Sequence, residues 1–357
     1  MLSLFYFMDR NGIQKYAIAA VLCLIFFFLG RKKMWDIKIF IIVVLPVLIY
    51  VLIGGINGMW YGTYQMVTVK NIVYTILPFV LAFSMSVYYE ENSLWIVDAE
   101  FVSSCLMYVV PNFGMLYLGY TWESTYSFVF GLFSIYYAYR KKWLVFLCSV
   151  FLTYRADKRI AIFGVILALC IMFLMWFFKY SKKLAITIWT TVVAFIYAYL
   201  GLIYSGKLES FCWAMNINTN GRVQMYTRMA NQYKFSIGFL GRGIGIMENM
   251  LEHMRIDSFA NLHNDLLKFY IELGFLGLFV YLTSYYIVFC IAEKNYEKSK
   301  VCFLLGISIY SMLLFATDNV SIYLMYLLPF FSTIFAVFVS KENICKRRNI
   351  DVKQTNQ

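Results

Sequence analysis

The sequence predicts an all-α polytopic membrane protein with about 11 transmembrane helices and one long extracytoplasmic loop. Hydrophobic residues make up 62% of the 357 residues and charged residues only 14%, whereas a soluble domain usually carries about 25% charged residues. The mean hydropathy is +0.69. Aromatic residues account for 20% of the chain, and membrane proteins place Phe against lipid and Tyr at the interface. This composition excludes a soluble protein.

Apolar runs near the roughly 20 residues that a helix needs to cross a bilayer recur along the chain. The fourth run is interrupted by Pro111, and the sixth is short. We expect a single membrane domain over residues 1–357, in which residues 205–265 form the long outer loop and residues 341–357 a basic cytoplasmic tail. The expected spans are residues 16–30, 37–54, 71–89, 101–119, 124–139, 143–154, 160–178, 184–204, 266–291, 301–316 and 320–339.

Lysine and arginine residues in the loops orient the bundle, because cytoplasmic loops carry an excess of them. Under strict alternation the basic clusters fall on one side, which we assign to the cytoplasm: residues 31–38, 140–142, 179–183, 294–300 and 346–348. An acidic loop with Asp98 and Glu100 falls there too, and the N-terminus lies outside. Because Arg31-Lys32-Lys33 follows the first apolar run instead of a small-residue cleavage site, we expect no cleaved signal peptide.

The net charge of +12 does not indicate nucleic-acid binding, because the cytoplasmic Lys and Arg account for it. The eight cysteines lack C-x-x-C spacing, and most lie in or beside apolar segments. We therefore predict no disulfide framework and no metal site. A partner is instead indicated by cations on the outer side, which suggest an anionic ligand there.

Two groups of cations are expected outside, against the general charge bias. One is Arg155-Ala156-Asp157-Lys158-Arg159, between the sixth and seventh spans. The other lies in the long loop and comprises Lys207, Arg222, Arg228, Lys234 and Arg242. If the alternation is wrong by one span, the first group becomes ordinary cytoplasmic charge. The long loop depends less on this assignment, because long segments cross the membrane largely regardless of charge.

Arg222 opens a helical pattern after Asn220-Gly221. Its face is shared by the apolar residues Met225, Tyr226, Met229 and Tyr233, which recur at helical spacing. Arg222 is therefore expected to point toward the membrane body, and Arg228 elsewhere. The alternative is that Arg222 only reaches lipid phosphates.

A glycine-rich segment follows, Gly238-Phe239-Leu240-Gly241-Arg242-Gly243-Ile244-Gly245. It lacks the full spacing of a dinucleotide-binding loop and follows no convincing strand. We interpret it as a tight turn, because glycine permits positive φ and close approach. Such a turn would present Arg242 and backbone N–H groups to an anion.

Polar residues gather where the ninth span begins. His263-Asn264-Asp265 precedes it, and Asp265, Lys268 and Glu272 form a stripe at helical spacing. Ionisable residues in a membrane segment usually face the protein interior or a wet cavity. The stripe can also be an internal salt-bridge ladder, and His263 a helix cap. Gly274 and Gly277 predict close helix packing, and Asp318-Asn319 a tight outer turn.

The order of these motifs resembles the O-antigen polymerase (Wzy-type) and O-antigen ligase family of bacterial envelope enzymes. The motifs are Gly221-Arg222, then Gly241-Arg242-Gly243-Ile244-Gly245, His263-Asn264-Asp265-Leu266-Leu267 and Glu272-Leu273-Gly274-Phe275-Leu276-Gly277. Lys158-Arg159-Ile160-Ala161 looks like the basic motif of that family, and Thr317-Asp318-Asn319 is similar to a turn common in the polymerases. The resemblance covers roughly the second half of the chain, an estimate made from span positions.

The resemblance implies a membrane glycosyltransferase of GT-C-like architecture in the bacterial plasma membrane. Polymerases of this family move a growing glycan from one undecaprenyl diphosphate to a lipid-linked repeat unit on the outer face. Ligases move the finished glycan to a lipid A core. The expected partners are therefore undecaprenyl-diphosphate-linked oligosaccharides and membrane lipid, with a chain-length regulator and a flippase as further candidates, and neither metal nor cofactor.

The residue chemistry suits a departing lipid diphosphate. Arginine is always charged and binds phosphate oxygens bidentately, so we expect Arg159, Arg222 and Arg242 to hold the diphosphate, with Lys158 and Arg155 beside them. His263 is the first candidate for the general base, because an imidazole titrates near neutral pH. Asp265 and Asp318 are rivals for that role, and Asn264 and Glu272 are further candidates for the site.

Two other functions compete with the polymerase. A ligase shares the fold and the motifs, and the polymerase is favoured by Thr317-Asp318-Asn319 and the compact length. A flippase or other transporter should show paired broken helices or repeated halves with polar residues at mid-membrane. Here the polar residues gather at the outer ends of spans, which favours chemistry at one surface.

Overall fold

The computed structural model describes residues 21–22, 25, 37–63, 66–89, 92–118, 123–217, 219, 221–253 and 262–339. The expected span at residues 16–30 falls almost wholly outside these residues, and the expected tail at residues 341–357 does so entirely. Over the described ranges the chain forms helices and turns and no strand, which agrees with the predicted all-α class.

Each of the other ten expected spans corresponds to a helix. The largest boundary difference is at α5, which begins at Ser93 and not near residue 101, so Asp98 and Glu100 belong to a helix and not to a loop. The outer loop contains three short helices, α10, α11 and α12. The helices are α3 (Ile37–Trp60), α4 (Met66–Tyr89), α5 (Ser93–Tyr117), α6 (Tyr126–Tyr139), α7 (Trp143–Arg155), α8 (Arg159–Phe177), α9 (Lys182–Tyr204), α10 (Lys207–Ala214), α11 (Arg222–Met229), α12 (Ile246–His253), α13 (Asp265–Asn295), α14 (Lys298–Phe315) and α15 (Leu324–Val339).

Seven of the described helices are long and apolar enough to cross a membrane, namely α3, α4, α5, α8, α9, α13 and α14. The apolar helices α7 and α15 are shorter. A chain in hydrocarbon must satisfy its backbone polar groups internally, which a helix does. The protein is therefore a multi-pass membrane protein.

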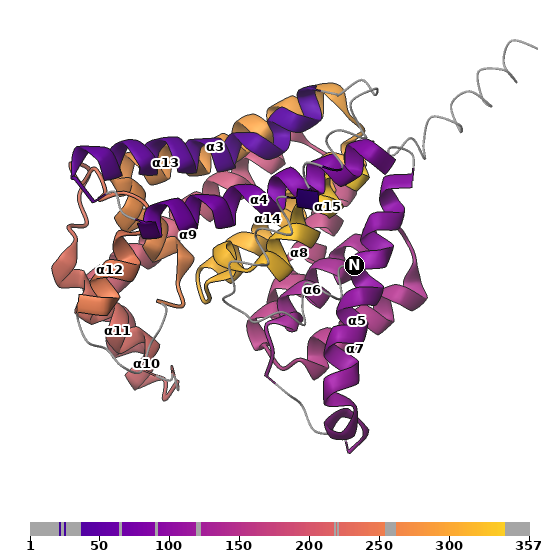
Figure 1. Cartoon of the computed structure of the whole chain (residues 1–357), viewed down its shortest axis with the longest axis horizontal. Helices are drawn as coiled ribbons and strands as arrows, with labels where there is room; N and C mark the ends of the chain where they lie inside the picture. Colours follow the sequence, from indigo (N-terminus) through magenta and orange to yellow (C-terminus); the bar gives the residue numbers. More distant parts are fainter. Residues whose placement is uncertain are drawn as a thin grey trace, which may run out of the picture.

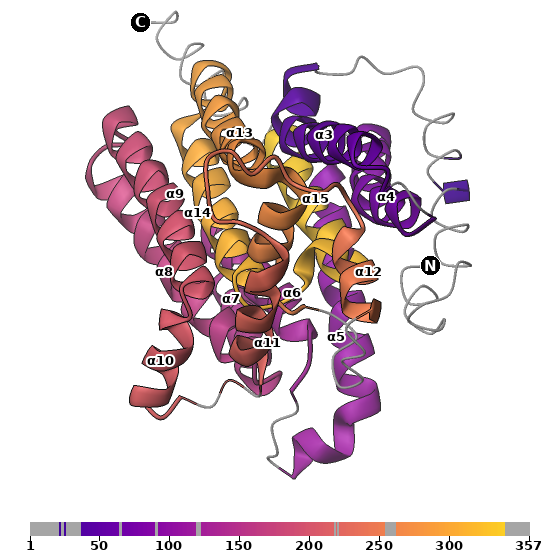
Figure 2. The same cartoon turned by 90° about the vertical axis from the view of Figure 1, so that its left-hand side faces the viewer.

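The short helix α6 lies at the centre of the bundle, where it contacts α7, α8, α14 and α15. Nearly all of its residues are buried. Around this centre α3 packs along α13, α8 along α14, and α15 against α4 and α5 (Figure 1). The outer-loop helices α10, α11 and α12 lie at the lower left in Figure 1 and are spread across the face turned toward the viewer in Figure 2.

Side-chain contacts divide the helix ends into two sets. At one end Lys142 pairs with Asp98, Lys182 with Glu293, and Lys300 donates to the Phe338 carbonyl. At the other end Lys158 pairs with Glu123 and Asp318. The expected alternation assigns the same loops to the same two sides, from α5 to α15.

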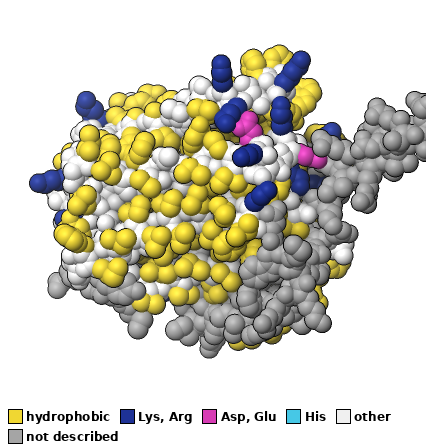
Figure 3. Space-filling view, turned by 90° about the horizontal axis from the view of Figure 1, so that it is seen from above, with side chains coloured by type: hydrophobic (Ala, Val, Ile, Leu, Met, Phe, Trp, Pro, Cys, Tyr) yellow, Lys and Arg dark blue, Asp and Glu magenta, His cyan; other side chains and the backbone are white. Residues whose placement is uncertain are grey.

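The molecular surface is consistent with a membrane-embedded belt. Seen from above, hydrophobic side chains cover a broad central field, and most Lys and Arg gather over one end (Figure 3). Exposed apolar side chains on the spans, such as Leu144, Phe163 and Phe195, are suited to contact lipid.

Helix α13 is broken at Gly274, whose φ of 80° and ψ of −179° are not helical. The Gly238–Gly245 segment fills the break: the Phe275 N–H donates to the Phe239 carbonyl over 2.8 Å, and the N–H groups of Arg242 and Gly243 donate to the Ile271 and Glu272 carbonyls. The loop thus replaces the helix hydrogen bonds that the break removes, as non-helical backbone at membrane depth requires.

Candidate active site

Four side chains predicted from the sequence meet at one end of the bundle: Lys158, Arg222, His263 and Asp318. They come from four separate segments. Lys158 precedes α8, Arg222 is the first residue of α11, His263 lies just before α13, and Asp318 lies between α14 and α15. We call these four residues the charged cluster.

Asp318 is the common partner in this cluster. Its Oδ1 lies 3.3 Å from His263 Nδ1 and accepts hydrogen bonds from the Tyr323 hydroxyl and the Asn319 N–H, and its Oδ2 lies 3.6 Å from Lys158 Nζ. Burial alone would raise the pKa of Asp318, but the His263 and Asn319 hydrogen bonds and the charge of Lys158 outweigh burial and lower it to about 2. Asp318 is therefore an anion at any physiological pH.

The charge of Asp318 fixes the form of His263. An ionised carboxylate only accepts hydrogen bonds, so His263 Nδ1 must carry the proton that it shares with Asp318. In the neutral imidazole the lone pair then lies on Nε2. The side chain is 27% exposed, so part of the imidazole ring is accessible from outside the protein.

The backbone of His263 is held in a strained form. Its φ of 53° lies in the left-handed region, which non-glycine residues seldom adopt and which clusters at functional sites. The Tyr226 hydroxyl donates to the His263 carbonyl over 2.7 Å. The hydrogen bond from α11 therefore holds His263 in a backbone conformation that the residue would seldom adopt on its own.

Lys158 is held between two carboxylates, Glu123 and Asp318, and its side chain is only 14% exposed. The hydrogen bond from Lys158 lowers the pKa of Glu123. Because two anions hold the ammonium in place, it is positioned before any substrate arrives. Glu123 is an acid just before a span, and no sequence motif marks it.

Arg222 reaches the same end from α11, where its Nη1 donates to the Thr317 carbonyl over 3.2 Å. This confirms the expected helix face: Met225, Tyr226 and Met229 are buried and Arg228 is exposed. A guanidinium has five N–H donors, and among the described residues Arg222 uses one of them in this hydrogen bond, which leaves donors to face an anion.

Asn264 and Asp265, both site candidates, hold the start of α13 in place. The Asn264 side chain caps the helix by accepting from the Leu267 N–H, and it donates to the Tyr199 hydroxyl. Asp265 is fully buried, and its two oxygens accept hydrogen bonds from the backbone and hydroxyl of Ser321. These contacts suit a role in positioning the turn that carries Asp318.

Two predicted diphosphate ligands, Arg155 and Arg159, flank Lys158 in the chain. Arg159 is exposed at the first position of α8 and has no polar contact with the part of the chain that the structure describes. Arg155 ends α7 and is half-buried. Within this basic motif, Lys158 is the residue that reaches Asp318.

The predicted anion-binding turn at Gly238–Gly245 is partly wrong. Gly241, Gly243 and Gly245 do have positive φ, but the N–H groups of residues 242–245 are already used inside the protein. Those of 242, 243 and 244 donate to backbone carbonyls, and the Gly245 N–H donates to Glu272 Oε1 over 2.9 Å. The turn therefore binds the carboxyl group of Glu272, and Gly241 packs directly against α13.

Arg242 lies apart from the charged cluster. Its backbone is fixed next to Ile271, six residues along α13 from Asp265, which is about 10 Å along the helix axis. Its side chain is half-buried and makes no hydrogen bond or ion pair with the described residues. Among the described residues Arg242 has no hydrogen bond or ion pair with the charged cluster, so its contact with a lipid diphosphate stays a prediction.

The expected ladder between Asp265, Lys268 and Glu272 is not formed. Lys268 pairs instead with Glu248 of α12 over 2.8 Å, and Glu272 accepts a hydrogen bond from the Tyr50 hydroxyl over 2.6 Å. Burial would raise the pKa of Glu248, but Lys268 outweighs it and lowers that pKa. The polar residues of α13 thus connect the broken helix to α3, to α12 and to the turn that contains Ser321. No sequence pattern predicted the contact with Glu248.

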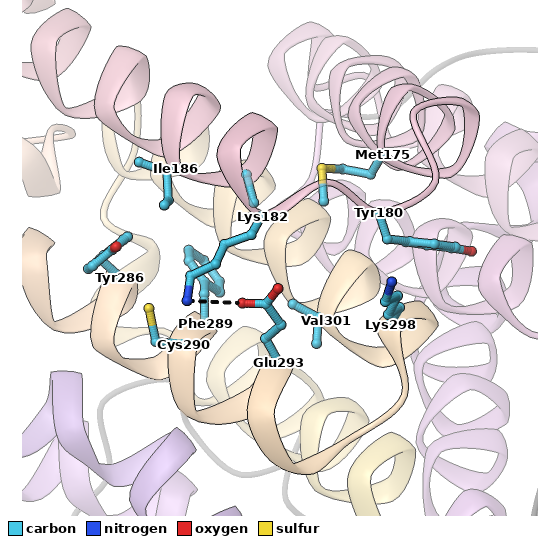
Figure 4. Close-up of a pocket in the computed structure, with 11 residues that line it drawn as sticks. Met175, Tyr180, Lys182, Ile186, Tyr286, Phe289, Cys290, Glu293, Lys298 and Val301 are labelled. Carbon is cyan, nitrogen blue, oxygen red and sulfur yellow. Dashed lines mark ion pairs between the residues drawn. The ribbon is translucent and has the colours of Figure 1, made fainter.

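A separate small cavity lies at the opposite end of the bundle, between α8, α9, α13 and α14. Figure 4 shows Lys182 reaching across it toward Glu293, with Nζ 3.6 Å from Oε2, among mostly apolar neighbours. Helix α9 separates it from the charged cluster, since Lys182 begins that helix and Tyr199 near its far end reaches Ala316. That is about 25 Å along the helix axis, so this cavity takes no part in the site.

Over the described residues, no group of three or more His, Cys, Asp or Glu side chains is arranged to hold a metal ion. The cluster offers one carboxylate and one imidazole beside two cations, a set that favours an anionic ligand over a metal.

Comparison with known proteins confirms the family resemblance over part of the chain. Residues 143–282 match the family described as O-antigen ligase. The match runs from the start of α7 through the break in α13 and includes Lys158, Arg222 and His263, whereas Asp318 lies beyond it. No curated protein matches the chain.

Proposed function

We propose that the protein is a polysaccharide polymerase that transfers a growing glycan from undecaprenyl diphosphate to a lipid-linked repeat unit. The reaction would take place on the outer face of the bacterial plasma membrane. The observation that carries the proposal is the charged cluster, in which two cations, a histidine and a buried carboxylate meet at one end of a membrane bundle.

The cations suit the leaving group. When the bond between the sugar and the lipid diphosphate breaks, its electrons go to a phosphate oxygen and the negative charge there grows. Arg222 and Lys158 are held in place by Thr317, Glu123 and Asp318, so stabilising this charge requires little reorganisation. Arg155, Arg159 and Arg242 remain proposed contacts for the lipid-linked substrates farther from the reacting atoms.

The histidine suits the acceptor. In the proposed step the acceptor hydroxyl oxygen forms a bond to the anomeric carbon, and its proton moves to Nε2 of His263. The resulting imidazolium is stabilised by Asp318, which stays ionised. Asp265 is less suited to be the base because Ser321 donates hydrogen bonds to both of its oxygens. Asp318 is also less suited, because a pKa of about 2 makes it a weak base. The sugar–phosphate bond drives the transfer, so no ATP is needed.

Complementation of a deletion strain tests this site. Arg222→Lys and His263→Ala, expressed at wild-type level, should each reduce polymer formation by about 10²–10³-fold, the usual loss when one transition-state contact is removed. Arg228→Ala is the matched control, because Arg228 is on the same helix but exposed. Full-length polymer from both site variants would remove Arg222 and His263 from the mechanism.

A ligase is the second candidate, favoured by the description of the matching family. It would use the same cluster with a different acceptor, the lipid A core. Glycan analysis of the deletion strain separates the two. Single repeat units on the lipid core indicate a lost polymerase, and accumulated long lipid-linked polymer indicates a lost ligase.

A further inference from the structure

The outer loop contains a polar cavity that the charged cluster does not use. It lies between α10 and α11 and has a volume of about 240 Å³. Ligand pockets for larger organic molecules measure about 300–1,000 Å³, so this cavity suits a small unit such as one sugar ring. Its polar lining residues are Glu209, Asn216, Thr219 and Gln224, and Trp213 stands beside them.

These polar side chains have no hydrogen-bond partner among the described residues. Within the described part of the chain, the side chains of Glu209, Asn216, Thr219 and Gln224 make no hydrogen bond, although all four line the cavity. The Oε1 atom of Gln224 is also buried without a described partner. A buried oxygen without a hydrogen-bond partner is unfavourable, and this one belongs to a residue that lines the cavity.

The chemistry of the lining matches a sugar. A carboxylate accepts hydrogen bonds from neighbouring sugar hydroxyls, and an amide both accepts and donates them. An indole offers a flat apolar face to the C–H side of a sugar ring, and aromatic residues supply contact area with little loss of conformational freedom. Trp213 is 72% exposed, so its ring is available to a ligand.

The position of the cavity also matches a glycan. Its wall includes Gly221 and Val223, the two chain neighbours of Arg222. Arg222 points from the same helix to Thr317 in the charged cluster. The cavity therefore lies beside the residue that donates into the charged cluster.

We propose that the cavity between α10 and α11 is a saccharide-binding subsite that holds one sugar unit of a substrate glycan through Trp213, Glu209 and Gln224. This inference rests on the proposed function, because it assigns the substrate glycan to this cavity. The glycan belongs either to the donor or to the acceptor, and kinetics on the two substrates separates these sources.

The test uses the full-length protein in lipid nanodiscs and calorimetric titration with the repeat-unit oligosaccharide released from the host's own lipid-linked precursor. Trp213→Ala and Gln224→Leu should each weaken binding about tenfold or more, as loss of a central contact does. Gln224→Leu guards against misfolding, because it replaces an unpaired buried amide oxygen with an apolar group of similar size.

The matched control is Phe211→Ala, on the same short helix. Phe211 is 55% exposed and does not line the cavity. If Trp213 only anchors α10 in the membrane interface, the Phe211 and Trp213 variants will behave alike and the inference is overturned. Equal binding by wild type and both cavity variants overturns it too.

Transfer kinetics then separate this inference from the proposed function. In the cavity variants, a raised KM for the single repeat unit at nearly unchanged kcat would show that the acceptor occupies this cavity. A raised KM for the lipid-linked polymer at nearly unchanged kcat would show that the donor occupies it. If the wild type transfers glycan and the cavity variants change neither KM, the proposed subsite is overturned and the proposed function is not. If the wild type binds the oligosaccharide but transfers no glycan, the proposed function is overturned and the binding site is not.

Discussion

Asp318 is the residue around which the site is organised. It binds His263 and Lys158 directly, and its neighbour Thr317 accepts from Arg222. A buried carboxylate is costly unless it is paired and hydrogen-bonded, and Asp318 has four such partners. The same contacts that make its burial tolerable set the tautomer of His263 and the position of Lys158.

The depressed pKa of Asp318 predicts acid sensitivity. Because the pKa falls from 3.8 to about 2 on folding, the folded protein binds this proton more weakly than the unfolded chain. The resulting stabilisation, roughly 2 kcal/mol, is complete above about pH 4 and is lost as the pH falls toward 2. Asp318→Asn should therefore lower the unfolding temperature at pH 7 and flatten its decline in acid.

The measurement is thermal unfolding of the purified protein in detergent as a function of pH. Asp157→Asn is a suitable control, because Asp157 is a nearby exposed aspartate. If Asp318→Asn loses stability in acid as steeply as the wild type, the carboxylate does not have the low pKa assigned to it.

At the scale of elements, the broken helix α13 and the Gly238–Gly245 segment form one interlocked unit. A Cβ atom on Gly274 would collide with the backbone of Leu240 and Gly241, and one on Gly241 with that of Gly274. Asn57 of α3 fastens the unit further, because its amide donates to the carbonyls of Leu240, Glu272 and Leu273. The break therefore fixes the position of the half-helix that begins at the site.

This interlock predicts that Gly274→Ala is strongly destabilising. The positive φ alone costs about 1–3 kcal/mol for a residue with a side chain, and overpacking adds a similar amount, so we expect a loss above roughly 3 kcal/mol. Gly55→Ala is the control, because a Cβ there meets no atom within 4 Å. Thermal unfolding and membrane protein level should fall for Gly274→Ala only; equal stability of the two variants would argue against the interlock.

At the scale of the whole molecule, the two ends of the bundle differ in chemistry. One end carries ordinary pairs such as Lys142–Asp98 and Lys182–Glu293, and the other carries the charged cluster and the outer-loop helices. Lipid-linked glycans are extended outside the cytosol in the proposed reaction, so the orientation of the bundle decides whether the function is feasible.

Cysteine labelling tests this orientation. In a background without native cysteines, Met215→Cys on the outer loop should react with a membrane-impermeant maleimide in intact cells. Lys294→Cys, at the opposite end, should react only after permeabilisation. Both positions are exposed. The reversed pattern would place the charged cluster in the cytosol and end the proposed function.

The amino-acid sequence by itself determined the membrane class, the approximate spans and the candidate residues of the site. Apolar runs set the helices because lipid leaves the backbone no other partner, and motif order identified Lys158, Arg222, His263 and Asp318. The helical face that turns Arg222 inward and Arg228 outward also followed from residue spacing.

Only the tertiary structure decided which of these residues meet. It brought Asp318 beside His263 across 55 positions of the chain, kept Arg242 apart and assigned the glycine turn to Glu272. The partners Glu123 and Glu248 carry no local signal, because their roles depend on lysines in other elements. Local patterns report how a segment folds, whereas a site made of distant segments is set by how the helices pack.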